Sequence, residues 1–128
     1  MDLFQNQQLV SVFQVIISLS VLKIWVINFN KPSQWRSGNS KTMKEEFEAY
    51  GLPDWSLYTV GFLKCAFSIG LIVGLWIPEI IQLSAFGIVF FMFFSIMMHI
   101  KIKDPIIKSL PEFILLILST LVILLYDQ

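Results

Sequence analysis

The sequence predicts an all-α integral membrane protein, an antiparallel bundle of four transmembrane helices with a short amphipathic helix in the first loop. Three observations lead to this fold class. The 128 residues are 56% hydrophobic and only 14% charged, which is more apolar than a soluble domain of this length can bury. Four apolar runs are long enough to cross a bilayer core of about 30 Å. The segments between them are short, so we expect residues 1–128 to form a single domain.

The predicted spans follow one another along the chain, at residues 9–29, 57–77, 80–100 and 110–126. The first apolar run is longer than a signal-peptide core and has no basic residue before it, so we expect it to be retained. Only Pro78 and Glu79 separate the second span from the third, which indicates a tight helical hairpin. The fourth span follows Ser109-Leu-Pro-Glu112, a capping-box pattern with proline in the first helical turn.

The loop at residues 30–56 contains the predicted amphipathic helix, at about residues 42–50. Its start matches a second capping box, Thr42-Lys-Glu-Glu45, and Gly51 supplies a stop signal. The apolar side chains of this segment share one helical face: Met43, Phe47 and Tyr50. We therefore expect a short helix that lies on the membrane surface.

Basic residues orient the predicted bundle. Seven of the nine lie in the loops at residues 30–56 and 101–109, whereas both termini and the hairpin turn carry none. The positive-inside rule then places these two loops in the cytoplasm and both termini outside, in a plasma (inner) membrane. The seven residues are Lys31, Arg36, Lys41, Lys44, Lys101, Lys103 and Lys108.

Several short motifs, in a fixed order, resemble the DoxX-like family of membrane proteins. The first loop contains Trp35-Arg-Ser-Gly38, Lys41, and Phe47 to Pro53 followed by Trp55. The second span contains Val60-Gly61, a charged residue at 64, and Gly70 to Pro78. The third loop contains His99-Ile-Lys101 and Asp104-Pro105, and Pro111 opens the last span. The resemblance runs from about Lys23 to the C-terminus.

This resemblance implies a compact four-helix membrane protein. The wider family includes a subunit of a thiosulfate:quinone oxidoreductase and proteins linked to thiol or oxidative-stress pathways. It therefore implies an accessory subunit of a redox or stress-related membrane system, with a quinone-binding pocket. The sequence departs from the family at Lys64, where the second helix commonly carries a glutamate.

Charged side chains inside the spans predict the position of a pocket. A charge at mid-bilayer costs about 2.5–3.5 kcal/mol on insertion scales, so such residues are candidates for function. Two lysines and a histidine in the cytoplasmic half could form a cationic pocket for an anion, a lipid headgroup or a quinone carbonyl, with a tryptophan packing on the ring. The candidate ligand-binding residues are Lys23, Trp25, Lys64, His99 and Glu112, with loop contacts from Arg36 and Lys41.

Each charged candidate also has a structural interpretation. Lys23 and Lys64 are each about 10 Å along their helices from the cytoplasmic face, within reach of snorkelling. His99 could be solvated by lipid headgroups, and Glu112 could serve only as the capping-box carboxylate. The small residues Ala66, Gly70 and Gly74 recur every four positions and predict close helix packing, whether within the bundle or against another chain.

The sequence excludes several kinds of cofactor site. One cysteine and one histidine provide no disulfide, no dithiol and no multi-histidine metal site, and we find no haem ligand pair or flavin motif. We assign no catalytic residue and expect no enzyme activity from this chain alone. We expect contact with lipid and with a membrane protein partner or a second copy, and not with nucleic acid.

Three functions remain open at this stage. The chain could be a quinone-binding accessory subunit, a binding or transport module for a small anion or lipid headgroup, or a ligand-free scaffold. The rotation of the second span distinguishes them. A scaffold should expose the Gly70–Gly74 surface to a partner, whereas a ligand-binding protein should use it internally and point Lys64 inward.

Overall fold

The computed structural model describes residues 3–31 and 40–126, and the regular structure in these two ranges is entirely helical. Four helical segments are long and apolar enough to cross a membrane: Gln7–Ile27, Asp54–Val73, Pro78–Lys101 and Ile106–Leu125. A fifth helix is short and lies in the first loop. The predicted fold class is therefore confirmed.

The first span changes its helical form near its end. Helix α1 (Leu3–Leu22) continues into a π-helical turn, η1 (Lys23–Ile27), which the Asn28 N–H closes by donating to the Lys23 carbonyl oxygen at 2.9 Å. A π-turn holds more residues per turn than an α-helix, so it changes which side chains face inward. In η1 it buries Trp25, which is only 8% exposed.

The short helix α2 (Met43–Tyr50) begins and ends with the predicted signals. Thr42 Oγ1 accepts from the Glu45 N–H at 3.2 Å, the N-terminal half of a capping box. At the other end Gly51 adopts φ 79°, and the Leu52 N–H donates to the Phe47 carbonyl oxygen at 3.1 Å, which is a Schellman motif. The buried face of α2 packs on α3 and α4, so this helix covers one end of the bundle.

The second and third spans form the predicted hairpin. Helix α3 (Asp54–Val73) begins directly after Pro53, three residues before the predicted span, and a 3₁₀ turn, η2 (Pro78–Ile80), leads into α4 (Ile81–Lys101). Because α3 begins early, Lys64 is its eleventh residue, about 15 Å from the helix start at 1.5 Å per residue. Lys64 therefore lies near the middle of the span.

A second Schellman motif ends α4. The Asp104 N–H donates to the His99 carbonyl oxygen, and the Lys103 N–H to that of Ile100, each at 3.0 Å. Lys103 occupies the left-handed position with φ 60°, where glycine is usual. This tight turn brings the Asp104 side chain back alongside the last turn of α4.

The fourth span starts differently from the prediction. A 3₁₀ turn, η3 (Ile106–Ser109), runs directly into α5 (Leu110–Leu125), and the Leu110 N–H donates to the Ile107 carbonyl oxygen. The preceding turn thus satisfies an N–H group that a cap would otherwise serve, and Ser109 makes no side-chain capping bond. The predicted capping box at Ser109–Glu112 is wrong, and Glu112 is available for other contacts.

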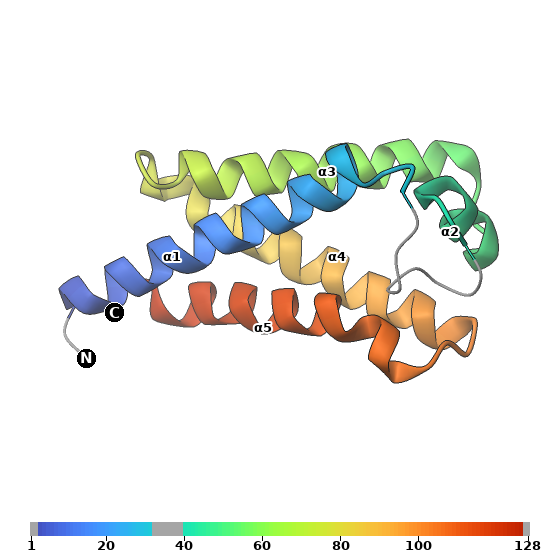
Figure 1. Cartoon of the computed structure of the whole chain (residues 1–128). Coiled ribbons are helices and arrows are strands. Elements are labelled where there is room, and N and C mark those ends of the chain that lie inside the picture. The colour runs from blue at the N-terminus through green and yellow to red at the C-terminus, as the bar shows by residue number, and fades with distance from the viewer. Residues whose placement is uncertain (1–2, 32–39, 127–128) are drawn as a thin grey trace.

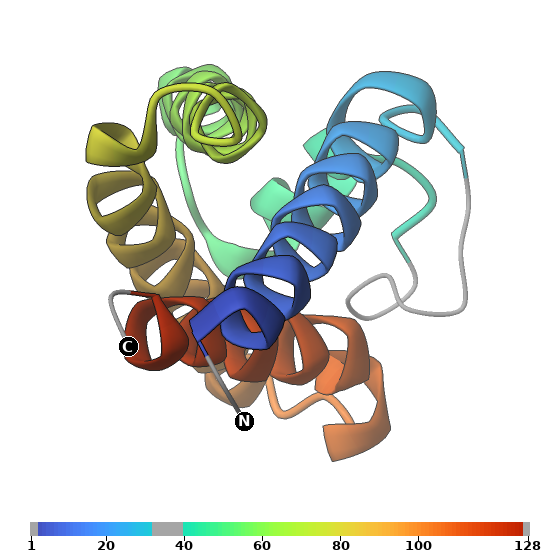
Figure 2. The same cartoon turned by 90° about the vertical axis from the view of Figure 1, so that its left-hand side faces the viewer.

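The four long helices form a ring in which α1 and α4 each contact both α3 and α5. Figure 1 shows α1 and α4 running diagonally between α3 at one side and α5 at the other. Both termini lie at one end of the bundle and α2 at the other, and Figure 2 gives the view along the helices from the terminal end. Helices α1 and α5 are therefore close at the terminal end and separate toward α2.

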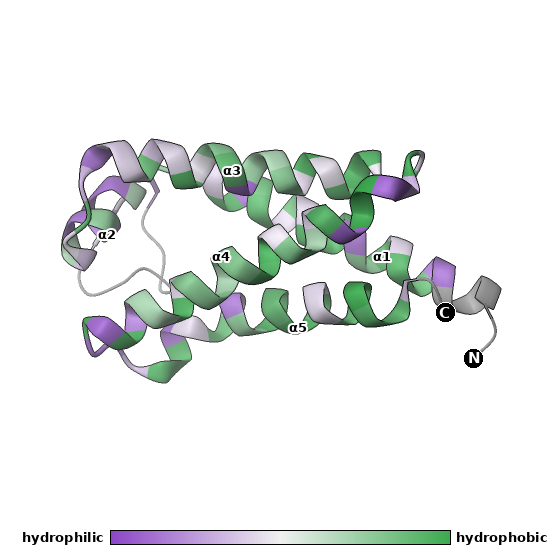
Figure 3. Ribbon diagram, turned by 180° about the vertical axis from the view of Figure 1, so that it is seen from behind, coloured by the Kyte–Doolittle hydropathy of each residue, from purple (hydrophilic) through white to green (hydrophobic). Residues whose placement is uncertain are grey.

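The outer surface of the bundle is apolar along the spans. Large exposed side chains occur on all four, including Leu19, Phe62, Phe90 and Ile117, each at least 57% exposed. In Figure 3 hydrophobic colouring follows the long helices, and hydrophilic residues gather in α2 and in the turn between α4 and α5. This distribution matches a bundle whose sides face lipid.

Two polar side chains of α1 form hydrogen bonds to the backbone of α3. Gln14 Nε2 donates to the Leu71 carbonyl oxygen at 2.7 Å, and Ser18 Oγ donates to that of Ser68 at 2.7 Å. Both donors are fully buried between α1 and α3. In an apolar membrane interior such bonds hold helices together.

Two of the three small residues of α3 allow close packing inside the bundle. A Cβ at Gly70 would collide with Ser84 Oγ, and one at Gly74 would lie 2.6 Å from Ile81 Cγ1 on α4. Ala66, by contrast, is exposed. Each step of four residues rotates the position by about 40°, so Ala66 has turned away from the α4 contact that Gly74 makes.

Candidate functional site

A cavity of about 560 Å³ lies at the α2 end of the bundle. Its walls come from the end of α1, from η1 and α2, from single turns of α3 and α4, and from the start of α5. This is where α1 and α5 separate in Figure 1 and where α2 covers the bundle end. The volume is within the range of about 300–1,000 Å³ that is usual for small-molecule sites.

Lys64 points from the middle of α3 into this cavity. Its side chain is buried, with 6% of the residue exposed, and Nζ donates to Ser95 Oγ on α4 at 3.0 Å. Within the described part of the chain Ser95 is the one hydrogen-bond acceptor at Nζ, so further N–H groups of the amine lack a protein acceptor. The side chain therefore faces the bundle interior and does not snorkel to the surface.

Aromatic side chains form a second wall. Lys64 Nζ lies 5.3 Å from the centre of the Trp25 ring, and Phe47 on α2 packs edge-on against that ring at 5.9 Å. Tyr50 extends the aromatic wall from Phe47 toward the end of α4. A planar ligand would thus meet a flat apolar surface beside a hydrogen-bond donor.

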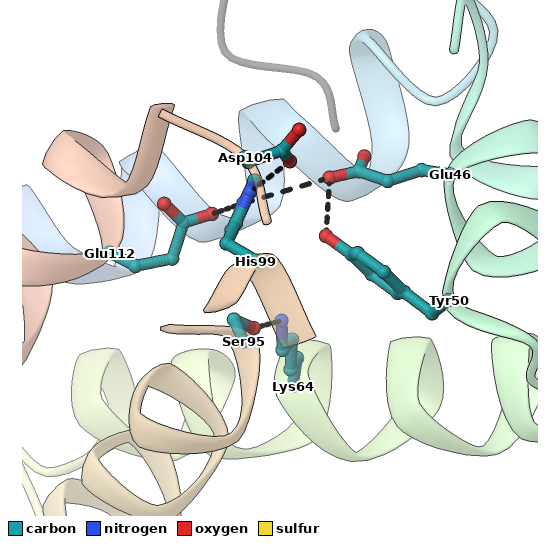
Figure 4. A network of polar contacts seen from close by, with 7 residues as sticks. All are labelled: Glu46, Tyr50, Lys64, Ser95, His99, Asp104 and Glu112. Carbon is teal, nitrogen blue, oxygen red and sulfur yellow. Dashed lines mark hydrogen bonds and ion pairs between the residues drawn. The ribbon is translucent and has the colours of Figure 1, made fainter. Parts of the chain in front are cut away.

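A cluster of acidic residues surrounds His99 above Lys64, as Figure 4 shows. His99 Nδ1 lies 2.8 Å from Asp104 Oδ2, and its Nε2 is 4.0 Å from Glu46 Oε1 and 3.8 Å from Glu112 Oε1. Tyr50 donates its hydroxyl proton to Glu46 Oε1 at 2.9 Å. The histidine, which is only 1% exposed, thereby joins α2, the turn after α4 and the start of α5.

The two glutamates of this cluster also line the cavity, whereas His99 and Asp104 lie behind them. Glu112 Oε2 is a buried oxygen with no hydrogen-bond donor among the described residues. Among the described residues, the other charged side chains that line the cavity are Lys23 and Lys64, so two lysines and two glutamates of this part of the chain face the space. Their formal charges balance, and these described walls do not carry the excess positive charge that the lysines alone predict.

The structure brings most of the predicted site residues together. Lys23, Trp25, Lys64 and Glu112 line the cavity, with Lys23 exposed at its edge, and His99 supports it from behind. Lys41 is exposed and does not line the cavity; its N–H donates to Glu45 Oε2 at 3.3 Å at the start of α2. The predicted loop contact from Arg36 lies outside the described residues.

Sequence reasoning missed four residues of the site: Glu46, Tyr50, Ser95 and Asp104. The position of Glu46 was detectable, because it is three residues after Met43 and four before Tyr50 and so shares their buried face. Asp104 reaches His99 only through a left-handed Lys103, which a sequence pattern does not indicate. Ser95 depends on the rotation of α4 against α3.

Comparison with known families identifies the chain. A sequence profile described as the DoxX-like family matches residues 21–122. The chain belongs to this family. Neither the curated proteins nor the solved structures contain a match. The DoxX-like match extends from the end of α1 to the last turns of α5, and it therefore includes every element that lines the cavity.

The chemistry of this DoxX-like site is that of polar recognition. It offers an amine donor at Lys64, carboxylate acceptors at Glu46 and Glu112, and an aromatic wall at Trp25. Within residues 3–31 and 40–126, no three His, Cys, Asp or Glu side chains are arranged to hold a metal ion. Such a site is suited to an uncharged ligand that both accepts and donates hydrogen bonds.

Proposed function

We propose that this DoxX-like protein binds a lipid-soluble quinone in the cavity beside Lys64 and acts as an accessory subunit of a redox or stress-related membrane system. The observation that carries the proposal is the buried amine of Lys64 in the cavity wall, 3.0 Å from Ser95 Oγ and 5.3 Å from the centre of the Trp25 ring. An amine beside an aromatic face can donate to a carbonyl oxygen while the ring stacks on the tryptophan.

The charged side chains among the described cavity-lining residues support a neutral ligand, because two lysines and two glutamates face the same space. Lys23 and Lys64 would attract an anion, but Glu46 and Glu112 face the same space and would repel it. A quinone carries no charge and needs only donors for its carbonyl oxygens. This balance makes a free anion, the alternative drawn from the lysines alone, a weaker candidate.

The edge of the cavity supports entry from the bilayer. Leu110 and Ile114 of α5 line the cavity and are 40% and 48% exposed, and Ile24 of η1 lines it on the opposite side. An isoprenoid tail could lie along these apolar side chains while the head group reaches Lys64. A water-soluble ligand would gain nothing from such an edge.

The packing of α3 weighs against a ligand-free scaffold. Gly70 and Gly74, the small residues that a partner helix would use, are already in contact with α4. Lys64 points into the bundle on the same helix. These two features are the ones that a ligand-binding protein requires of this helix.

The proposal is tested by extracting the protein after purification in mild detergent and measuring total quinone, oxidised plus reduced, by liquid chromatography. We expect near-stoichiometric quinone in the native protein and little in a Lys64→Met variant, which keeps the length of the side chain but not its donors. A Lys44→Met variant is the matched control, because Lys44 is exposed on α2 and does not line the cavity.

Absence of quinone from all three samples would refute the proposal, provided that added ubiquinone-1 also fails to bind. An anionic lipid or free anion extracted with the native protein, and lost in Lys64→Met, would identify the site as a headgroup or anion site. Equal quinone in the native protein and Lys64→Met would show that quinone binds elsewhere.

A further inference from the structure

We infer that the cavity selects the reduced, hydroxyl-bearing form of its ligand, a hydroquinone, over the oxidised quinone. This inference rests on the proposed function and specifies which form of the ligand the site takes. It arises from two carboxylates in the cavity wall, which the proposed function does not use.

The two carboxylates come from different helices. Glu46 and Glu112 both line the cavity, from α2 and α5, and both face Nε2 of His99. An ionised carboxylate has only acceptor lone pairs, so a ligand that contacts it must supply the proton of the hydrogen bond. The carbonyl oxygens of a quinone are also acceptors only, so they cannot form hydrogen bonds with the carboxylates.

The Glu112 carboxylate leaves acceptor capacity toward the cavity. Glu112 lines the cavity with its side chain 21% exposed, and its Oε1 lies 3.8 Å from His99 Nε2, beyond hydrogen-bond distance. Its other oxygen, Oε2, is fully buried. A ligand hydroxyl could donate to the exposed side of this carboxylate, and a carbonyl oxygen could not.

His99 packs against the two glutamates that line the cavity. Its Nδ1 is fixed by Asp104 at 2.8 Å, and this pair is set by the Schellman turn at the end of α4. Its Nε2 then lies between Glu46 and Glu112, at 4.0 and 3.8 Å from their nearer oxygens. The acceptors therefore belong to a supported arrangement and not to flexible surface side chains (Figure 4).

Lys64 completes the match with a hydroquinone. One ligand oxygen can accept from Lys64 Nζ, which has N–H groups beyond the one directed at Ser95. The hydroxyl on the other side of the ring can then donate to a glutamate. A hydroquinone satisfies the lysine and a glutamate at once, whereas a quinone satisfies only the lysine.

The test compares ubiquinol-1 with ubiquinone-1, which differ by two hydrogen atoms, by isothermal titration calorimetry in detergent under nitrogen. We expect ubiquinol-1 to bind about 10- to 100-fold more tightly, the range that a hydrogen bond to a charged group supports. Glu112→Gln and Glu46→Gln each supply an amide donor in place of an acceptor, so at least one of them should reduce this preference to about threefold or less.

Glu48→Gln is the matched control, because Glu48 is exposed on α2 and does not line the cavity. This variant should prefer ubiquinol-1 over ubiquinone-1 by the same factor as the native protein. Native protein that binds ubiquinone-1 as tightly as ubiquinol-1 would overturn the inference and leave the proposed function intact. A preference that survives both glutamine substitutions would overturn it as well. Failure of both ligands to bind would instead remove the proposed function.

Discussion

A single methyl group at Gly61 should disturb both the fold and the cavity. A Cβ at this position of α3 would lie 2.8 Å from Cε3 and from Cζ3 of Trp25. Ordinary contact begins at 3.4 Å, so the indole must retreat by about 0.6 Å. Trp25 lines the cavity, so a displaced indole changes the shape of the cavity wall.

The expected cost follows from the way in which Trp25 is held. The ring is 8% exposed and is packed against Phe47 and Phe29, with centroids 5.9 and 6.2 Å away, so it cannot retreat into solvent. Extra atoms in a well-packed core destabilise by about 1–3 kcal/mol. We therefore expect Gly61→Ala to lower the free energy of unfolding by that amount and to weaken binding of ubiquinol-1.

Gly87→Ala is the matched perturbation away from the site. A Cβ there would lie 2.5 Å from Cδ2 and Cε2 of the Phe67 ring, between α3 and α4, and neither residue lines the cavity. Thermal unfolding in detergent and calorimetric titration with ubiquinol-1 should show a stability loss in both variants but a binding loss only in Gly61→Ala. Native-like stability of Gly61→Ala, or equal binding losses in the two variants, would refute this reasoning.

Two further predictions concern stability alone. Lys103→Gly should raise the free energy of unfolding by about 0.5–1 kcal/mol. Glycine adopts the φ of 60° without the steric cost that lysine bears, and the greater entropy of glycine in the unfolded chain offsets part of this gain. A lower thermal midpoint would contradict the prediction. Gln14→Leu should lower the free energy of unfolding by about 0.6–1.7 kcal/mol, because it removes the 2.7 Å bond to the Leu71 carbonyl oxygen. Unfolding in graded dodecyl sulfate measures the second change, and an unchanged midpoint would show that the bond contributes nothing.

The fold was predictable because its signals are local. Hydropathy located the four spans, and the Thr42 cap and Gly51 stop gave α2 almost to the residue. Boundaries failed where neighbouring turns replaced the expected cap. The 3₁₀ turn before Leu110 made the Ser109 cap unnecessary and left Glu112 available to the cavity.

The site was predictable only in part, because it depends on helix rotation and on one unusual turn. The early start of α3 moved Lys64 to mid-span, where the sequence alone had placed it within snorkelling distance of the surface. No local pattern relates α3 to α4, so the Ser95 contact could not be predicted. Glu46 of α2 lines the cavity together with Glu112 of α5, and this pairing across distant segments favours the quinone over the anion among the ligands that the sequence leaves open.

The exposed apolar edge formed by Leu110 and Ile114 affects how occupancy of the cavity should be expressed. A site that opens among lipid-facing side chains is filled from the membrane phase, where an apolar molecule is concentrated far above its level in water. Its occupancy then follows the mole fraction of that molecule among the lipids and not its aqueous concentration. Dissociation constants measured at different detergent or lipid concentrations will therefore agree only when the ligand concentration is expressed per mole of amphiphile.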